Sequence, residues 1–334
     1  MTAGTRQGRV KATDVAQAAG VSRATVGFVL NNTAGITISK TTADRVRETA
    51  ERLGYRPHSA AQALARGSSN VVLMALPDWP IEYTFRRHLE ETERRLNQAG
   101  YSMITYTKRA APQARPLWEV LAPDVVIGIV PFTAEELAAL RAAGIERVFP
   151  DAAVDLEENP FIRSGPELQV QHLAERGHRT LAYAAPADER HSPLSSIRER
   201  TARREAERLG LNLIRSGAVS IDGLAGSSLE EWLAAGVTGV ISFNDDVAAA
   251  VIHKARDLAI GVPDQLAVIG YDDTPLARLF FPSITSVRIE TAELGRHLAE
   301  VALASVAGNP APPYSGARAV IAERESTATK DASA

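Results

Sequence analysis

The pattern of hydrophobic and polar positions changes near residue 70. Before it, apolar residues recur at helical spacing within short polar segments; Val46, Ala50 and Leu53, for example, share one face of a helix. After it, continuous apolar runs such as 71–77 and 124–130 alternate with amphipathic segments, which is typical of α/β domains with buried parallel strands. The chain therefore divides into a small helical head and a larger α/β body.

The head is predicted to contain three helices. Thr13, Ser22 and Ser39 are the expected N-caps, and Gly20 and Gly54 end the first and third helices. Because the first two helices are joined by a tight turn, this is the plan of a helix-turn-helix.

The body is predicted to be a doubly wound parallel sheet structure, and its length favours two lobes. We expect strands at 71–77, 101–107, 124–130, 146–149, 180–184, 211–215, 238–243 and 266–270. We expect helices at 84–98, 114–121, 134–142, 166–176, 194–208, 228–234, 246–258 and 291–306. A short alanine-rich helix precedes the body, and the small polar residues from Ser326 onward are expected to fray.

Composition and charge narrow the range of functions. The 334 residues are 45% hydrophobic and include no cysteine, which excludes disulfides and thiolate chemistry. No apolar run is long enough to span a membrane and no secretory signal is recognisable, so we expect a cytoplasmic protein. Residues 1–67 hold ten basic and four acidic side chains, whereas the rest hold 27 basic and 36 acidic ones. A basic head on an acidic body points to a module that binds a polyanion.

No arrangement of residues points to catalysis. The seven histidines are scattered without metal-ligand spacing, and the sequence contains no nucleophile elbow or phosphate-binding loop. We therefore expect no catalytic residue, no metal and no cofactor. A sugar-binding transport component would share the fold of the body, but it would need an export signal and would have no basic head.

Eight motifs follow one another in a specific order and spacing over almost the whole chain. In the head they are VKATDVAQAAGVSRATV (10–26), VLN (29–31), LGYRP (53–57) and SAAQALARG (59–67). In the body they are GHR (177–179), ISFNDDVAAAVI (241–252), GVPDQLAVIGYDD (261–273) and PSITSV (282–287). This series resembles the LacI/GalR family of bacterial transcription regulators.

The resemblance implies a domain plan and a function. It implies a helix-turn-helix DNA-binding domain at 1–58, a hinge helix and linker at 59–69, a two-lobed periplasmic-binding-protein-like domain for effector binding and dimerisation at 70–325, and a flexible tail at 326–334. The function implied is that of a homodimeric repressor that binds a palindromic operator in double-stranded DNA. A small effector, expected to be a sugar or sugar derivative, would bind between the lobes; a ligand-independent regulator with a degenerate cleft is the alternative.

In the head, the second helix is expected to enter the major groove with its N-terminal side chains facing base edges. The expected DNA-binding residues are Thr13, Ser22, Arg23, Ala24, Thr25, Phe28, Asn31, His58, Ala61 and Leu64. The resemblance places base readout at Arg23, Ala24 and Phe28, and an apolar minor-groove wedge at Leu64.

Each of these roles has a structural alternative. Arg23 could contact a phosphate instead of a base, and Phe28 could belong to the core of the head. Asn31 could be a helix C-cap, and Leu64 could pack against another hinge or the body.

In the body, ligands are expected beyond the carboxyl ends of the strands. The expected effector-binding residues are Asp78, Trp79, Phe85, Arg163, Arg198, Asn244 and Asp272. The resemblance implies that Asn244, Asp272 and an arginine face the ligand. Arg198 is the expected arginine, and Arg200 is the alternative. Arginine and carboxylates for hydroxyl groups, with aromatic rings for a sugar face, suit a carbohydrate.

Several of these side chains could have structural roles instead. Asn244 and Asp245 could cap the following helix, and Asp272 and Asp273 could form a turn. Arg163 stands near a position where the family usually has an aspartate. Its presence is open to two interpretations, an acidic or phosphorylated effector or a pocket that has lost its ligand.

Overall fold

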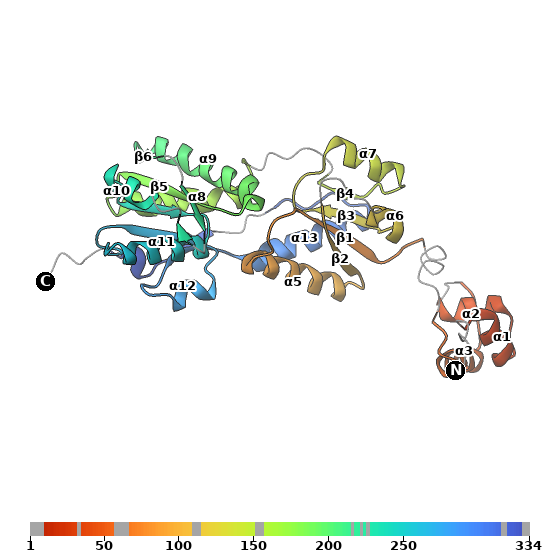
Figure 1. Ribbon diagram of the computed structural model, residues 1–334. Helices are drawn as coiled ribbons and strands as arrows, with labels where there is room; N and C mark the ends of the chain where they lie inside the picture. The colour runs from red at the N-terminus through yellow and green to blue at the C-terminus, as the bar shows by residue number, and fades with distance from the viewer. Residues whose placement is uncertain are drawn as a thin grey trace, which may run out of the picture.

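The computed structural model describes residues 10–31, 35–56, 67–108, 115–150, 157–214, 217–220, 223–224, 228–314 and 319–328. Within them the chain forms a helical head and two α/β lobes (Figure 1). The expected succession of a helix-turn-helix head and a two-lobed parallel-sheet body is confirmed. The expected hinge helix at 59–66 lies outside the described residues.

The head consists of helices α1 (Ala12–Ala19), α2 (Arg23–Leu30) and α3 (Lys40–Arg52). The three helices enclose a small apolar core to which Val15, Val26 and Val46 contribute. Burial of these side chains holds α2 in place, because helices of eight residues are marginal on their own.

Two of the three expected N-caps of the head are confirmed. Ser22 Oγ accepts the backbone N–H of Thr25 at 3.0 Å, and Ser39 Oγ accepts that of Thr42 at 3.3 Å. The third was wrong: the N-cap of α1 is Lys11, whose backbone N–H donates to the Asp14 carboxylate at 2.8 Å. Thr13 therefore lies within the first turn of α1.

The first lobe is a parallel four-stranded sheet in the order β2-β1-β3-β4. Its strands are β1 (Val71–Leu76), β2 (Ser102–Thr107), β3 (Val125–Gly128) and β4 (Val148–Phe149). Its helices are α5 (Tyr83–Gln98), α6 (Leu117–Leu121), α7 (Ala134–Ala142) and α13 (Thr291–Val306). α5 and α13 pack on one face of the sheet, and α6 and α7 pack on the other.

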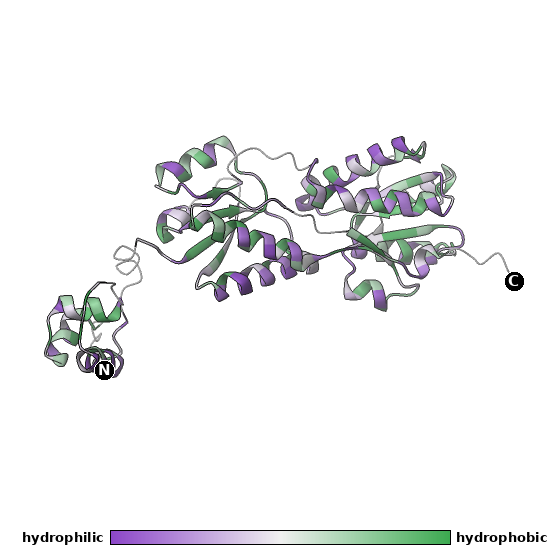
Figure 2. Cartoon of the chain, turned by 180° about the vertical axis from the view of Figure 1, so that it is seen from behind, coloured by the Kyte–Doolittle hydropathy of each residue, from purple (hydrophilic) through white to green (hydrophobic). Residues whose placement is uncertain are grey.

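The second lobe has a larger sheet in the order β12-β11-β10-β9-β5-β7-β8, with β6 paired to β5. The strands are β5 (Thr180–Pro186), β6 (Asn212–Leu213), β7 (Gly217–Ser220), β8 (Gly223–Leu224), β9 (Gly239–Ser242), β10 (Ala267–Tyr271), β11 (Thr285–Ile289) and β12 (Ala319–Ala322). The helices are α8 (Pro160–Glu175), α9 (Ser192–Arg208), α10 (Ser228–Ala234), α11 (Asp245–Asp257) and α12 (Pro275–Leu279), with short 3₁₀ turns η1 (Glu189–His191) and η2 (Glu325–Thr327). In both lobes the central strands are hydrophobic and the outer helix faces are hydrophilic (Figure 2).

The chain passes between the lobes after β4, after β11 and before β12. As a result, α13 belongs to the first lobe although it lies late in the sequence (Figure 1). Such crossovers connect two separate cores, so the lobes can move as rigid bodies about them. Among the described helices, none has the length and apolar character needed to cross a membrane.

Some element boundaries differ from the expectation. α8 begins at Pro160 instead of near 166, because Asn159 Oδ1 accepts the backbone N–H of Phe161 at 3.0 Å and Pro160 fits the first helical position. The prediction that the chain frays from Ser326 onward is wrong for its first two residues. Ser326 and Thr327 are buried, and Ser326 Oγ donates to the Val268 carbonyl at 2.6 Å.

Candidate DNA-binding face and effector cleft

α2 presents one side to the core of the head and the other to solvent. Val26 and Val29 are buried, whereas Arg23, Ala24 and Phe28 are exposed. Phe28 is 37% exposed, so the alternative in which it belongs to the core is wrong. The exposed side therefore carries a cation, a small apolar group and an aromatic ring, which can reach base edges in a groove.

The hydroxyl residues of α2 take part in its cap. Ser22 Oγ lies 2.8 Å from Thr25 Oγ1, in addition to its bond with the Thr25 backbone. Asn31 is the C-cap of α2, as its structural alternative had it, and its backbone N–H donates to the Gly27 carbonyl at 3.0 Å. Thr13 is exposed on α1.

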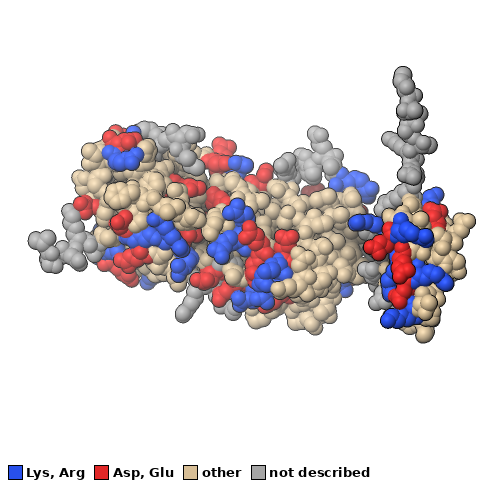
Figure 3. Space-filling view, turned by 90° about the horizontal axis from the view of Figure 1, so that it is seen from below, with Lys and Arg blue, Asp and Glu red and all other residues tan. Residues whose placement is uncertain are grey.

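Three residues of the expected DNA contact, His58, Ala61 and Leu64, lie outside the described residues. The face of the head that Figure 3 shows carries side chains of both charges. The excess of basic residues in the head is thus not a uniform patch on that face.

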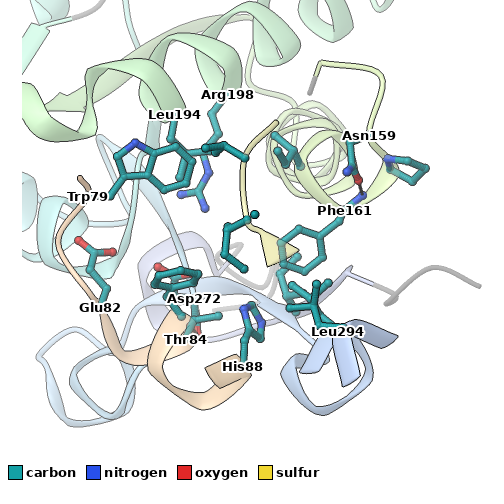
Figure 4. Close-up of a pocket in the computed structure, with 18 of the residues that line it drawn as sticks. Trp79, Glu82, Thr84, His88, Asn159, Phe161, Leu194, Arg198, Asp272 and Leu294 are labelled. Atoms are coloured by element: carbon teal, nitrogen blue, oxygen red, sulfur yellow. Dashed lines mark hydrogen bonds between the residues drawn. The ribbon is translucent and has the colours of Figure 1, made fainter. Parts of the chain in front are cut away.

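A cavity of about 580 Å³ lies between the two lobes, a size typical of sites for small ligands (Figure 4). The first lobe contributes Trp79 after β1, the segment 128–131 at the end of β3, and Phe149 at the end of β4. The second contributes Phe243 after β9 and Asp272 after β10. The cavity therefore lies where both sheets present the carboxyl ends of their strands.

One end of the cavity is formed by Glu82, Arg198 and Asp272, which we call the polar half. The Arg198 guanidinium donates to the Phe243 carbonyl at 2.7 Å, and its central carbon lies 3.8 Å from the centre of the Tyr271 ring. Burial raises the pKa of Asp272 to about 6, although the charge of Arg198 opposes this shift. A buried cation and a carboxylate thus stand side by side.

Glu82 connects the lobes. It precedes α5 in the first lobe, yet its Oε1 accepts the side-chain N–H of Asn244 at 3.0 Å and lies 2.9 Å from His191 Nε2, both in the second lobe. Burial alone would raise the pKa of Glu82, but the hydrogen bonds from His191 and Asn244 outweigh it and the pKa is lowered. Thr84 Oγ1 adds a third link by donating to the Asp272 carbonyl at 3.3 Å.

The opposite end of the cavity is lined by Phe85, His88, Phe161 and Leu294, together with Asn159, His297 and Tyr314, and we call it the aromatic half. The His88 ring meets Phe161 edge to face, with ring centres 5.5 Å apart. Burial, assisted by the charge of Arg87, lowers the pKa of His88 to about 4, so its imidazole is neutral near pH 7. Among the described residues, His88 Nε2 has no hydrogen-bond partner.

The turn that presents Asp272 is built on a buried ion cluster. Asp272 and Asp273 both have positive φ, at 96° and 46°. Asp273 is buried and is paired with Arg324, with Arg278 at 3.2 Å and with Arg288 at 3.6 Å. The structural alternative, in which Asp272 and Asp273 form a turn, is therefore confirmed. This turn directs Asp272 to the cavity.

The structure brings together four of the seven residues predicted for the effector. Trp79, Phe85, Arg198 and Asp272 line the cavity. Asn244 caps α11 through its Oδ1, which accepts the Val247 backbone N–H at 2.9 Å, and it reaches the cavity only through Glu82. The competitor Arg200 lies outside the cavity lining and is paired with Glu157.

Asp78 and Arg163 were expected to contact the effector, and the structure does not place them there. Asp78 is exposed, and neither residue lines the cavity. Arg163 lies on α8 and forms ion pairs of 3.1 Å with Glu158 and with Glu167, so its charge is already matched. It provides no reason to expect an acidic effector.

Sequence reasoning missed Glu82, Thr84, His88 and His191. His191 follows a predicted strand, so the rule of strand carboxyl ends could have found it. His88 lies one turn after Phe85 on the same predicted helix, and this spacing places both side chains on one face. Within the described residues, no group of three or more histidines and carboxylates could hold a metal ion.

Comparison with known proteins agrees with this architecture. Residues 12–58 match the family model of bacterial regulatory proteins, lacI family, and residues 170–327 match that of a periplasmic binding protein-like domain. The HTH-type transcriptional regulator GalS of Salmonella typhimurium is 30% identical over 318 residues, which cover 88% of this chain and 89% of that protein. The HTH-type transcriptional regulator DegA of Bacillus subtilis is 30% identical over 84% of this chain and 87% of its own.

A solved structure shows the same fold. The lac repressor dimer bound to operator and the anti-inducer ONPF matches with a TM-score of 0.73 at 20% identity, and the match covers 96% of this chain and 100% of that one. With a relative at 30% identity over nearly the full length and a matching DNA-binding domain, the chain belongs to the lacI family of bacterial regulatory proteins.

Proposed function

We propose that this regulator represses transcription by binding a palindromic operator as a homodimer, and that a small carbohydrate-type effector in the cavity controls its affinity for DNA. The observation that carries the proposal is that one chain combines an exposed α2 face with a cavity walled by two lobes. A DNA-binding domain and a domain that can bind a small ligand are thus parts of one chain.

DNA binding is assigned to residues 1–58 and the hinge to residues 59–69. α2 enters the major groove, where Arg23 can pair with guanine and Ala24 and Phe28 can meet thymine methyl groups. Leu64 of the hinge is the proposed wedge in the minor groove, which would add specificity by deforming the duplex.

Effector control follows from the position of the cavity. A ligand that contacts Glu82 and Thr84 in the first lobe and Arg198 and Asp272 in the second binds one lobe arrangement better than another. Such differential binding shifts the equilibrium between arrangements, with a coupling free energy of about 1–3 kcal/mol in typical cases.

The second lobe offers a surface for a second copy of the chain. Leu279 and Phe281 are 84% and 83% exposed, and Phe281 lies beside a groove that Ile252 and Val262 also line. Large apolar side chains exposed this close together mark interaction surfaces. Sedimentation equilibrium of the full chain tests this part, and a monomer would contradict it.

DNA binding is tested by selecting sequences from a random double-stranded library with the full-length protein. Arg23→Ala should weaken binding to the selected sequence tenfold to hundredfold, as the loss of a bidentate base contact does. Arg86→Ala, which removes an exposed arginine of the body, is the matched control and should change nothing. Retention of specific binding by a protein that lacks residues 1–67 would refute the assignment.

A further inference from the structure

The two halves of the cavity differ in chemistry. The polar half offers a guanidinium and two carboxylates, whereas the aromatic half is walled mainly by rings, those of Phe85, Phe161, Tyr314, His88 and His297. They are parts of one continuous cavity of about 580 Å³, so a single ligand can occupy both (Figure 4).

We propose that the effector is amphipathic: a hydroxylated ring bound in the polar half, joined to an uncharged flat ring that enters the aromatic half and exchanges a hydrogen bond with His88. This inference rests on the proposed function and specifies the effector of the same cavity. Aryl glycosides and nucleosides share this chemistry.

The polar half is suited to neutral hydroxyl groups. Arg198 can donate to a hydroxyl oxygen, and Asp272 and Glu82 can accept hydroxyl protons. One cation stands among two carboxylates, so the site provides no excess positive charge that would favour an anionic ligand. Adjacent hydroxyls on a sugar-like ring satisfy donors and acceptors at the same time.

The aromatic half favours a flat ring. Phe85, Phe161 and Leu294 can offer no hydrogen bond through their side chains, so a hydroxyl group that contacts only these three would lose its hydrogen bonds to water. The edge-to-face arrangement of His88 with Phe161 and with Phe85 instead builds an aromatic wall, against which a flat ring can pack.

His88 favours a flat ring that carries one hydrogen-bonding atom. Its side chain is only 3% exposed, and its Nε2 is buried with no hydrogen-bond partner among the described residues. A buried polar atom of this kind is costly unless a ligand or water satisfies it. Because the imidazole is neutral, it can exchange one hydrogen bond with a ring nitrogen or a phenolic oxygen.

The flat ring would contribute to regulation as well as affinity. Phe85 and His88 belong to α5 of the first lobe, whereas Phe161 belongs to α8 of the second. A ring between them contacts both lobes, as the hydroxylated ring does at the other end. An effector that lacks the flat ring would therefore hold the lobes together less firmly.

The test is isothermal titration of the full-length protein with matched pairs of probes. The pairs are methyl and phenyl β-D-glucoside, methyl and phenyl β-D-galactoside, methyl and phenyl β-D-xyloside, and D-ribose and adenosine. We expect the ring-bearing member of at least one pair to bind tenfold or more tightly than its partner, and the pair that responds separates glycosides from nucleosides. Equal affinities within every pair, or no binding by any ring-bearing probe, would overturn the proposal.

Variants of the aromatic half test which side chains cause the tighter binding of the ring-bearing probes. Phe161→Ala should reduce the advantage of the ring-bearing probe at least threefold and leave the ring-free partner unchanged. Val120→Ala, which removes an exposed apolar side chain of α6 outside the cavity, should alter neither. His88→Phe should weaken adenosine or 4-hydroxyphenyl β-D-glucoside about fivefold while phenyl β-D-glucoside is unaffected. Unchanged affinity for both would remove the hydrogen bond from the proposal.

Operator binding by the same preparation, measured without probes, keeps the two proposals separate. Ring-free and ring-bearing probes that bind equally would refute the amphipathic effector and leave the regulator intact. Loss of all specific DNA binding would refute the regulator, whatever the probes do.

Discussion

Asp245 is a fully buried carboxylate at the start of α11. Its Oδ1 accepts the Ser286 hydroxyl at 2.5 Å, and its Oδ2 accepts the Thr274 backbone N–H at 2.7 Å. Burial raises the pKa of Asp245 to about 7, although these hydrogen bonds oppose the shift. Between about pH 4 and pH 7 the folded chain therefore holds a proton that the unfolded chain has released.

This residue predicts how stability depends on pH. Because the folded state binds the extra proton, the free energy of unfolding should fall as the pH rises from 5 to 7, by roughly 1 kcal/mol per pH unit from this group. Asp245→Asn should make the fall smaller by about 2 kcal/mol over that range. Urea unfolding at pH 5, 6 and 7 measures the free energy of unfolding. Asp257→Asn, on the exposed side of α11, is the matched control. Equal pH slopes in the two variants would contradict the prediction.

Single residues of the cavity were predictable where they follow a strand. Asp272 stands in a motif and comes directly after β10, whereas Arg198 lies on α9 and was predicted from the family resemblance. Glu82 was missed because its role depends on its bonds to the second lobe, an approach that no local pattern encodes, whereas the helical spacing from Phe85 could have indicated His88. Arg163 was wrongly predicted to contact the effector, because Glu158 and Glu167, close to it in the sequence, already pair with its charge.

At the scale of elements, α5 and α13 pack unusually closely at Gly295. A Cβ there would lie 2.7 Å from the His88 carbonyl oxygen and 2.8 Å from Glu91 Cβ. In an exposed helix, glycine to alanine stabilises by roughly 0.5–1 kcal/mol, so this glycine is retained for packing. Gly295→Ala should instead lower the free energy of unfolding by about 1–3 kcal/mol, because the helices must separate.

Gly261→Ala is the matched control, because the nearest atom to its added Cβ lies at an ordinary 3.4 Å. Urea unfolding followed by circular dichroism compares the two variants. A Gly295→Ala protein that is more stable than the wild type would show that the helices do not depend on this contact.

Elements with a continuous apolar run or a long amphipathic face were predictable. β1 and β3 lie within one residue or two of the expected ends, and α10 and α13 coincide with the expectation. Four strands were missed: β7, β8, β11 and β12. β7, β8 and β12 have only two to four residues, which is too short a pattern, and the five residues of β11 begin with Thr285 and Ser286 instead of an apolar run. The start of α8 was encoded by Asn159 followed by Pro160, a capping signal that was overlooked.

At the scale of the whole molecule, a small set of contacts fixes the lobes relative to one another. Glu82 reaches Asn244 and His191, and Thr84 reaches the carbonyl of Asp272, so one short segment of the first lobe contacts three places in the second. Glu82, Thr84, His191 and Asp272 line the cavity, and none of them belongs to either hydrophobic core. These polar groups, with the ring contact between His88 and Phe161, set the lobe arrangement, and loss of the polar groups should change it without unfolding either lobe.

Glu82→Ala should shift the equilibrium toward separated lobes by about tenfold, because a hydrogen bond to a charged group contributes about 1.5–3 kcal/mol. The chain contains no cysteine, so spin labels at Arg141→Cys on α7 and Glu207→Cys on α9 report the distance across the cleft without background. We expect a new population at longer distance in Glu82→Ala and none in Glu90→Ala, whose nearby Arg86 belongs to the same helix. If the distance distribution of Glu82→Ala equals that of the control, Glu82 does not hold the lobes together, and control of DNA binding must then depend on contacts that the effector itself makes.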